Sequence, residues 1–264
     1  MLKSQYLKNY RHRTEKPIFK NRFFRLFILI LIIFITAFYL ICFFPFFQIK
    51  KIEISENQKI SSDDLKHLIE DKLTKKILFF NSKSLFLADL KEIEENILKK
   101  YPEIEKVGFF KKIPDKLLVL IKERKPVAVF EKDNSYFLID EKGIVFEKIE
   151  EKQNFLLIKK PEFTEEIKLG NGLIEEGQME QILKVSPEFK NKNLEFQIDF
   201  AQILNEQRLN IKTSGGFEIY FDLLGDISQQ VLNLSVVLKE KISPEERRNL
   251  EYIDLRFGNQ IYYK

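Results

Sequence analysis

The chain of 264 residues has one cysteine, two histidines and no tryptophan. A single cysteine, Cys42, excludes an intramolecular disulfide, so any folded region must be stabilised by its apolar core. This fits a bacterial envelope protein better than a small secreted domain held together by disulfides.

The scarcity of histidine and cysteine also limits the available chemistry. His12 lies in the N-terminal tail and His67 lies beyond a long apolar run. No hydrolase serine motif accompanies His67, and a zinc site needs more histidine or cysteine ligands. The sequence has no P-loop and no G-x-G-x-x-G motif. Neighbouring carboxylates such as Glu94 and Glu95 are expected by chance among 40 acidic residues. We therefore predict no catalytic residue, metal, cofactor or small-molecule substrate.

Charge is distributed unevenly along the chain. Residues 1–25 hold eight basic residues and one acidic residue, whereas the rest of the chain holds 36 basic and 39 acidic residues. The bulk of the protein therefore has no surplus positive charge to bind nucleic acid, and we predict no nucleic-acid partner. A membrane span directly after the tail explains its basic character better.

Residues 26–47 carry no charge and form the longest apolar run. As a helix this run would be about 33 Å long, enough to cross a hydrocarbon core of about 30 Å. The alternatives are a cleaved signal peptide, which is usually shorter and followed by small residues, and a buried helix of a soluble core. We favour an uncleaved transmembrane helix. The positive-inside rule then places residues 1–25 in the cytoplasm and the bulk outside.

The next segment, residues 48–123, has the pattern of a small α/β unit. Ile52 and Ile54 alternate with polar residues as in a strand, and helical spacing follows from Ser61 and again from Leu87. Two strands are then expected, at 104–110 and 116–122. The order β-α-α-β-β predicts a two-layer domain.

Residues 124–264 have a mostly β pattern. We expect strands and hairpin-like turns up to residue 147 and three more strands from 194 to 222. Helices are expected at 178–185 and 227–238, and strands at 252–257 and 261–263 close the chain. Residues 148–177 give no clear assignment. The terminal strand lies either at an open sheet edge, where a partner strand could add, or under other residues.

Three stretches, in order and behind an anchor, resemble one family, that of the bacterial cell-division proteins FtsQ and DivIB. The first is residues 47–54 (FQIKKIEI), followed by Asn57 and Ile60-Ser61. The second is residues 123–128 (ERKPVA) with 138–146 (LIDEKGIVF) after them, and the third is residues 252–257 (YIDLRF). The second is the most specific. Glu56 stands where the family usually has glycine, and residues 148–177 match little.

The resemblance implies an α+β fold with an N-terminal transmembrane helix, a POTRA-type domain at 48–123 and a mostly antiparallel β domain at 124–264 with one or two helices. It also implies a non-catalytic, single-pass (type II) scaffold of the inner or plasma membrane at the division septum. The expected partners are FtsB/DivIC-like and FtsL-like single-pass proteins, which link the scaffold to septal peptidoglycan synthesis. Carried over by position, the partner-binding residues are Arg256, Phe257, Ile261 and Tyr262.

Two other functions remain open at this point. A membrane-anchored cell-envelope hydrolase would need a clustered acid and base, for which the sequence offers no distinctive pair. A POTRA-containing transport component would need lipid-facing strands of about ten residues, and no such run stands out.

Overall fold

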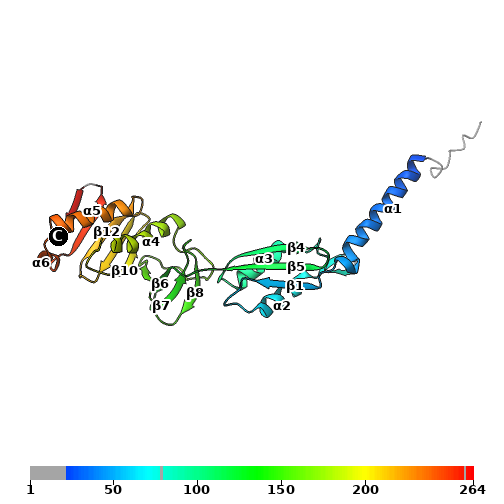
Figure 1. Cartoon of the computed structure of the whole chain (residues 1–264), viewed down its shortest axis with the longest axis horizontal. Coiled ribbons are helices and arrows are strands. Elements are labelled where there is room, and N and C mark those ends of the chain that lie inside the picture. The colour runs from blue at the N-terminus through cyan, green and yellow to red at the C-terminus, as the bar shows by residue number, and fades with distance from the viewer. Residues whose placement is uncertain (1–21, 78–79, 259) are drawn as a thin grey trace, which may run out of the picture. The chain divides into compact units, whose positions relative to one another are not determined.

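The computed structural model describes residues 22–77, 80–258 and 260–264 (Figure 1). His12 and most of the predicted cytoplasmic tail lie outside the described residues. An apolar helix precedes a three-stranded sheet with helices, which is followed by a nine-stranded, mostly antiparallel sheet. The predicted α+β fold class is confirmed.

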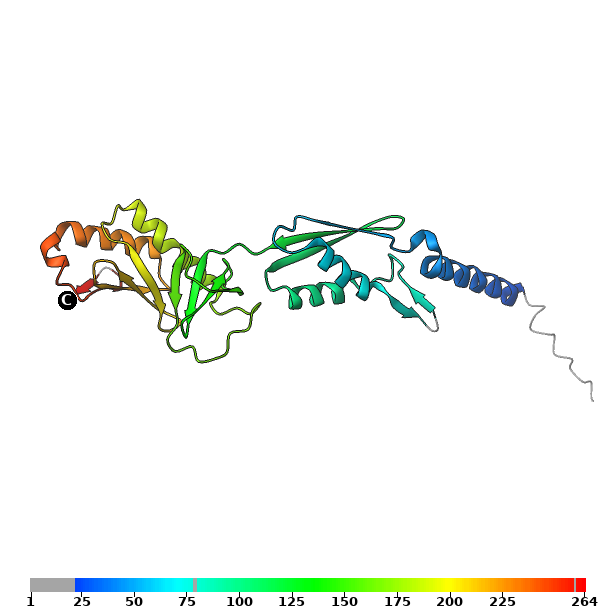
Figure 2. The same ribbon diagram turned by 90° about the horizontal axis from the view of Figure 1, so that it is seen from below.

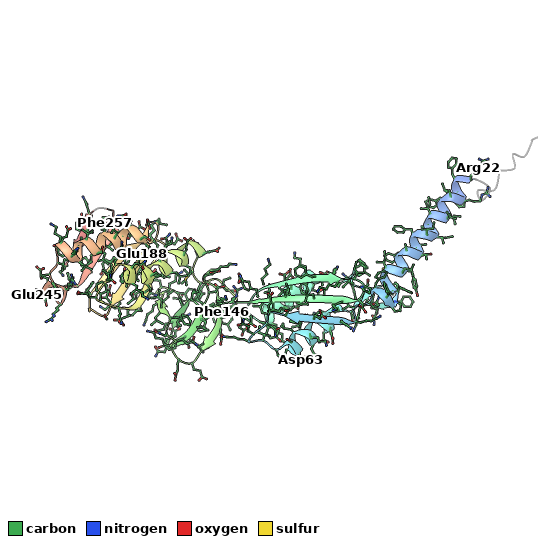
Figure 3. The ribbon with its side chains drawn as sticks, in the orientation of Figure 1. Arg22, Asp63, Phe146, Glu188, Glu245 and Phe257 are labelled. Carbon is green, nitrogen blue, oxygen red and sulfur yellow. The ribbon has the colours of Figure 1, made fainter. Side chains whose placement is uncertain are left out.

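The apolar segment forms α1, Arg22–Phe43, and the 3₁₀ turn η2, Pro45–Phe47. The helix therefore ends before the predicted residue 47. Pro45 explains this, because the residue before a proline avoids the helical conformation, and Phe44 is extended with ψ of 127°. Among the described residues, α1 is the helix that could cross a membrane by length and composition. Its side chains project outward along its length (Figure 3).

The next region has the predicted order β-α-α-β-β with one addition. It contains β1 (Lys51–Ser55), α2 (Ser62–Leu73), α3 (Leu90–Lys100), β4 (Ile104–Lys112) and β5 (Lys116–Glu123). The strands are ordered β1-β5-β4. A small hairpin of β2 (Lys75–Ile77) and β3 (Phe80–Ser82) was not predicted, because its strands have only three residues each.

The nine-stranded sheet has the order β14-β13-β12-β11-β10-β9-β6-β7-β8. Its strands are β6 (Ala128–Lys132), β7 (Ser135–Ile139), β8 (Val145–Ile149), β9 (Leu156–Lys159), β10 (Ile198–Ile203), β11 (Arg208–Thr213), β12 (Glu218–Asp222), β13 (Tyr252–Phe257) and β14 (Gln260–Tyr263). The unassigned segment 148–177 contributes β9, which lies between β6 and β10 and is parallel to both.

Two helices, α4 (Glu176–Asn191) and α5 (Ile227–Glu240), cover one face of this sheet (Figure 2). The predicted helix at 178–185 is therefore longer, and it contains Pro187 near its C-terminal end. The main core lies between these helices and the strands. A short helix, α6 (Pro244–Arg247), begins with a capping box made by Ser243 and Glu246.

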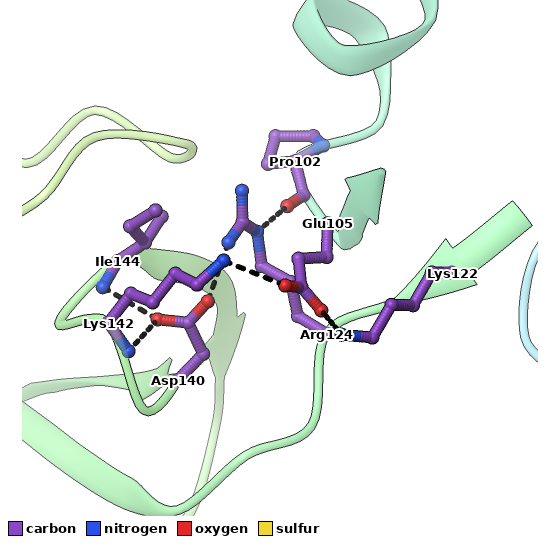
Figure 4. A network of polar contacts seen from close by, with 7 residues as sticks. All are labelled: Pro102, Glu105, Lys122, Arg124, Asp140, Lys142 and Ile144. Atoms are coloured by element: carbon purple, nitrogen blue, oxygen red, sulfur yellow. Dashed lines mark hydrogen bonds and ion pairs between the residues drawn. The ribbon is translucent and has the colours of Figure 1, made fainter. Parts of the chain in front are cut away.

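A buried ion pair joins the segment after β5 to the turn between β7 and β8 (Figure 4). Arg124 Nη1 donates to Asp140 Oδ2 at 2.5 Å, and the two side chains are only 10% and 5% exposed. Asp140 Oδ1 accepts from the backbone amides of Lys142 and Ile144. Arg124 Nε donates to the Pro102 carbonyl at 3.0 Å. Both carboxylate oxygens of Asp140 therefore accept hydrogen bonds, and the buried negative charge is compensated by Arg124.

Gly143 is required by the same turn. Its φ is +75°, and a Cβ at this position would lie 2.0 Å from the Ile174 carbonyl oxygen. Only glycine fits both constraints.

Candidate partner-binding edge

The terminal strand β14 is one edge of the nine-stranded sheet, as one of the two sequence-based alternatives states. Tyr252 and Lys264 exchange both of their backbone hydrogen bonds, and Tyr263 lies opposite Ile253. Because such pairs alternate in an antiparallel ladder, the N–H and C=O of Tyr263 point away from β13. The same alternation directs the backbone groups of Ile261 outward. The edge therefore offers unpaired donors and acceptors to an added strand.

The other edge of the sheet, β8, differs because a loop partly covers it. The Val145 amide donates to the Asn171 carbonyl at 3.1 Å, and the Gly170 amide donates to the Val145 carbonyl at 2.7 Å. Among the described residues, β14 has no comparable cover. An incoming strand therefore finds β14 more accessible than the start of β8.

Phe257 and Tyr262, both expected to bind a partner, lie together beside this edge. Their rings meet edge to face with centroids 5.4 Å apart, and they are 55% and 51% exposed. Phe257 is the last residue of β13 (Figure 3). Ile261 does not join them, because its side chain packs against the main core. The two exposed rings form an apolar contact surface of the kind that often contributes most to binding.

Arg256, the remaining predicted residue, is already paired within the chain. Its Nε and Nη2 donate to the two carboxylate oxygens of Asp254 at 2.8 and 2.6 Å. Burial disfavours the charged carboxylate, but the hydrogen bonds from Arg256 prevail and lower the pKa of Asp254. The same pair raises the pKa of Arg256. The positive charge of Arg256 is thus largely neutralised before any partner arrives.

The face that carries Arg256 continues into a row of stacked side chains that the sequence analysis missed. The rings of Tyr220 and Tyr252 stack at 5.2 Å, and the Arg208 guanidinium lies 4.4 Å from the Tyr220 ring centre. Burial, followed by the charge of Glu218, raises the pKa of Tyr220. The period-two alternation of polar and apolar residues in β12 and β13 was the signal that could have revealed this row.

No cluster of three or more His, Cys, Asp or Glu side chains that could hold a metal ion was found in the described ranges. His67, the one histidine that the structure describes, is exposed on α2. The described residues at β14 offer backbone groups and two exposed aromatic rings, which can bind a chain by backbone pairing and ring contact.

Two family models match adjoining parts of the chain. The model described as "POTRA domain, FtsQ-type" matches residues 47–124, and "Cell division protein FtsQ/DivIB, C-terminal" matches residues 128–256. The first covers β1 to β5, and the second covers most of the nine-stranded sheet, up to Arg256.

Curated relatives are similar over most of the chain. "Cell division protein DivIB" of Clostridium botulinum strain Hall is 30% identical over 230 residues, which cover 83% of this chain and 82% of the relative. The proteins of the same name from Clostridium tetani and Clostridium acetobutylicum are 24% and 25% identical, and the matches cover 85% and 83% of those relatives.

The Asp254–Arg256 pair gives a pH-dependent prediction. Asp254→Asn should lower the free energy of unfolding at neutral pH by about 1–3 kcal/mol, because it removes charge-assisted hydrogen bonds from a nearly buried site. The folded pKa is lowered, so this stabilisation is present above the ordinary value of 3.8 and disappears as the pH falls further, through the folded pKa. Urea unfolding of the full chain in mild detergent at several pH values measures it.

The matched control is Asp199→Asn, which changes an exposed carboxylate on β10. It should change the unfolding free energy by less than about 0.5 kcal/mol. Equal stabilities of the wild type and Asp254→Asn at neutral pH would contradict the assigned role of the pair.

Proposed function

This chain belongs to the FtsQ/DivIB family of cell division proteins, and from that premise we propose that it is a non-catalytic scaffold of the division machinery. In this proposal α1 anchors the chain, and its outer part binds FtsB/DivIC-like and FtsL-like single-pass proteins. Through them it connects to septal peptidoglycan synthesis. The observation that carries the proposal is the open, aromatic-flanked edge at β14.

The proposed topology follows from the charges around α1. The tail of residues 1–25 holds eight basic residues and one acidic residue, and it stays in the cytoplasm. Residues 48–264 then lie outside the cytoplasm, where cell-wall synthesis takes place. The alternative of an envelope hydrolase gains no support from the described residues around β14, which offer rings and backbone groups.

The partner binds by adding a strand to β14. The outward N–H and C=O of Ile261 and Tyr263 supply backbone hydrogen bonds, each contributing about 0.5–1.5 kcal/mol. The exposed rings of Phe257 and Tyr262 pack against apolar side chains of the added strand. Arg256 holds Asp254 and the adjoining end of β13 in place, so its contribution is to position Phe257.

Backbone pairing can be tested separately from side-chain contact at Tyr263. Tyr263→Pro removes the outward N–H and leaves the facing carbonyl of the added strand without a donor, which costs about 1–3 kcal/mol. It should therefore weaken binding of the DivIC-like protein from the same cell by about tenfold. Tyr263→Ala removes the ring and keeps the N–H, so it should weaken binding by less than about threefold. Affinities of the full chain in mild detergent, measured by biolayer interferometry, give the comparison.

Proline is tolerated on an edge strand whose N–H faces solvent, so both Tyr263 variants should unfold at the wild-type temperature. If the proline variant is folded and binds as tightly as the alanine variant, strand addition at β14 is excluded.

The aromatic pair supplies a second test. Phe257→Glu should weaken the same complex by at least about tenfold, because docking would bury an unpaired carboxylate. Phe257 is 55% exposed, so the free chain should remain folded. The control is Leu169→Glu, at a residue 40% exposed beside the loop that covers β8. Equal affinity of these two variants would reject the proposed surface.

The scaffold role also predicts a location in the cell. A fluorescent protein fused to the N-terminus should gather at midcell before constriction and should bring the DivIC-like partner with it. Fluorescence microscopy of dividing cells measures both. Even distribution around the envelope throughout constriction would count against the division role, whatever the binding measurements give.

A further inference from the structure

Side chains of the β2–β3 hairpin region donate hydrogen bonds to the last carbonyl groups of the membrane helix α1. Ser82 Oγ donates to the Cys42 carbonyl at 2.5 Å, and Ser84 Oγ donates to the Ile41 carbonyl at 2.7 Å. The Gln48 side-chain amide adds a third bond, to Cys42, at 2.9 Å. The last carbonyls of a helix have no partner within the helix, and leaving them bare near lipid is costly. These residues therefore hold the hairpin region at the depth where α1 ends.

Ring contacts hold the same residues against the helix end. The rings of Phe43 and Phe80 meet with centroids 5.7 Å apart, and those of Phe47 and Phe86 meet at 5.4 Å. Phe43 is the last residue of α1. Figure 2 shows the hairpin beside this end of the helix. Phe80 and Phe86 thus lie at the C-terminal end of α1 and the turn η2 although they are far beyond both in the sequence.

Four phenylalanines around this joint are exposed to an unusual degree for such apolar side chains. Phe44, Phe46, Phe80 and Phe86 are 46%, 52%, 63% and 44% exposed. We refer to these four residues as the phenylalanine collar. Monomeric soluble proteins rarely leave large, contiguous apolar patches in water.

We propose that the phenylalanine collar is a second membrane-binding surface, which inserts into the lipid at the leaflet where α1 ends. The hairpin thereby becomes part of the anchor. The occupant is the bilayer itself, because the collar continues the exposed apolar surface of α1 through direct ring contacts. A protein partner would have to displace lipid from this position to reach the same rings.

The length of α1 supports this assignment. Its uncharged part, residues 26–43, is about 27 Å long, slightly shorter than a hydrocarbon core of about 30 Å. The collar adds apolar side chains where the helix falls short. Exposed Lys76 and Lys83 lie in the hairpin region, and basic side chains beside a membrane surface attract the phosphates of anionic lipids; Lys50 is also exposed but is paired with Asp115 at 3.8 Å.

The absence of tryptophan from the chain makes a direct test possible. Phe80→Trp places one tryptophan in the collar, and Phe257→Trp places one at a similarly exposed site, 55% against 63%. Each full chain is reconstituted in vesicles of phosphatidylcholine and phosphatidylglycerol. Brominated lipids should quench tryptophan fluorescence in Phe80→Trp at least about twofold more than in Phe257→Trp, because the collar side chain contacts lipid.

Iodide, a quencher confined to water, should quench the tryptophan of Phe257→Trp more strongly than that of Phe80→Trp. Brominated lipid in both leaflets makes the result independent of the direction of insertion. Flotation of each variant with the vesicles tests anchoring by α1 separately, so its failure is distinguishable from failure of the collar. Phe86→Trp repeats the measurement at a second collar position, in case Phe80→Trp misfolds.

Equal lipid quenching of the collar variants and Phe257→Trp, in chains that float with the vesicles, would overturn the proposal. Strong iodide quenching of both collar variants would also overturn the proposal. It would show that the collar faces water and is available to bind a protein.

Discussion

Each backbone amide and carbonyl group of the described residues needs a hydrogen-bond partner, in lipid along α1 and in water elsewhere, and much of the structure follows from this constraint. In lipid it requires α1 to be helical. At the end of α1, Ser82 and Ser84, about forty residues further along the chain, donate hydrogen bonds to helix carbonyls at 2.5 and 2.7 Å. In the nine-stranded sheet, each inner strand forms backbone hydrogen bonds with both of its neighbours. At the edge strand β14, water or a partner must supply the hydrogen bonds on the open side. The two proposed binding surfaces therefore lie at points where the ordinary backbone pattern stops.

Patterns of local origin were predictable from the sequence. The alternation around Ile52, the acidic start of α2 and the strand at 252–257 all follow from short-range spacing, and the structure has them. The segment β9 was not predictable in the same way, because Leu157 and Ile158 face two different apolar clusters and leave no polar alternation. The β2–β3 hairpin is too short to give a periodic signal.

The candidate site was predictable in part. A place for the terminal strand at an open sheet edge was one of the two alternatives that the sequence left open, and which backbone groups face outward depends on the register with β13. Sequence could not show that Ile261 turns toward the core, nor that Arg256 is held by Asp254. Both facts depend on which face of the sheet each side chain occupies. The register between β13 and β14 shifts between Asp254 and Phe257, so simple alternation along the sequence does not predict these faces.

The most specific part of the family resemblance has a physical basis in the joint after β5. Arg124 lies in one matching stretch and Asp140 in the other, and they form the buried ion pair with the shortest contact in that network. A buried carboxylate without its arginine would remain an uncompensated charge, so neither residue can change alone at low cost. Gly143 in the same turn cannot carry a side chain. A motif that looks like a loop signature is therefore a set of mutually dependent contacts.

Because Arg256 is already paired with Asp254, its charge contributes little to the choice of a partner at the β14 edge. Separating Arg256 from Asp254 to pair it with a partner would sacrifice bonds at 2.6 and 2.8 Å, and a new ion pair of the same kind would bring little net gain. Backbone pairing cannot discriminate well between partners, because every chain offers the same groups. In the proposed complex, discrimination between partners then comes from the rings of Phe257 and Tyr262, with Arg256 and the stacked row beside it holding them in place. In the proposed complex the charged side chains position the aromatic rings, and the aromatic rings select the partner.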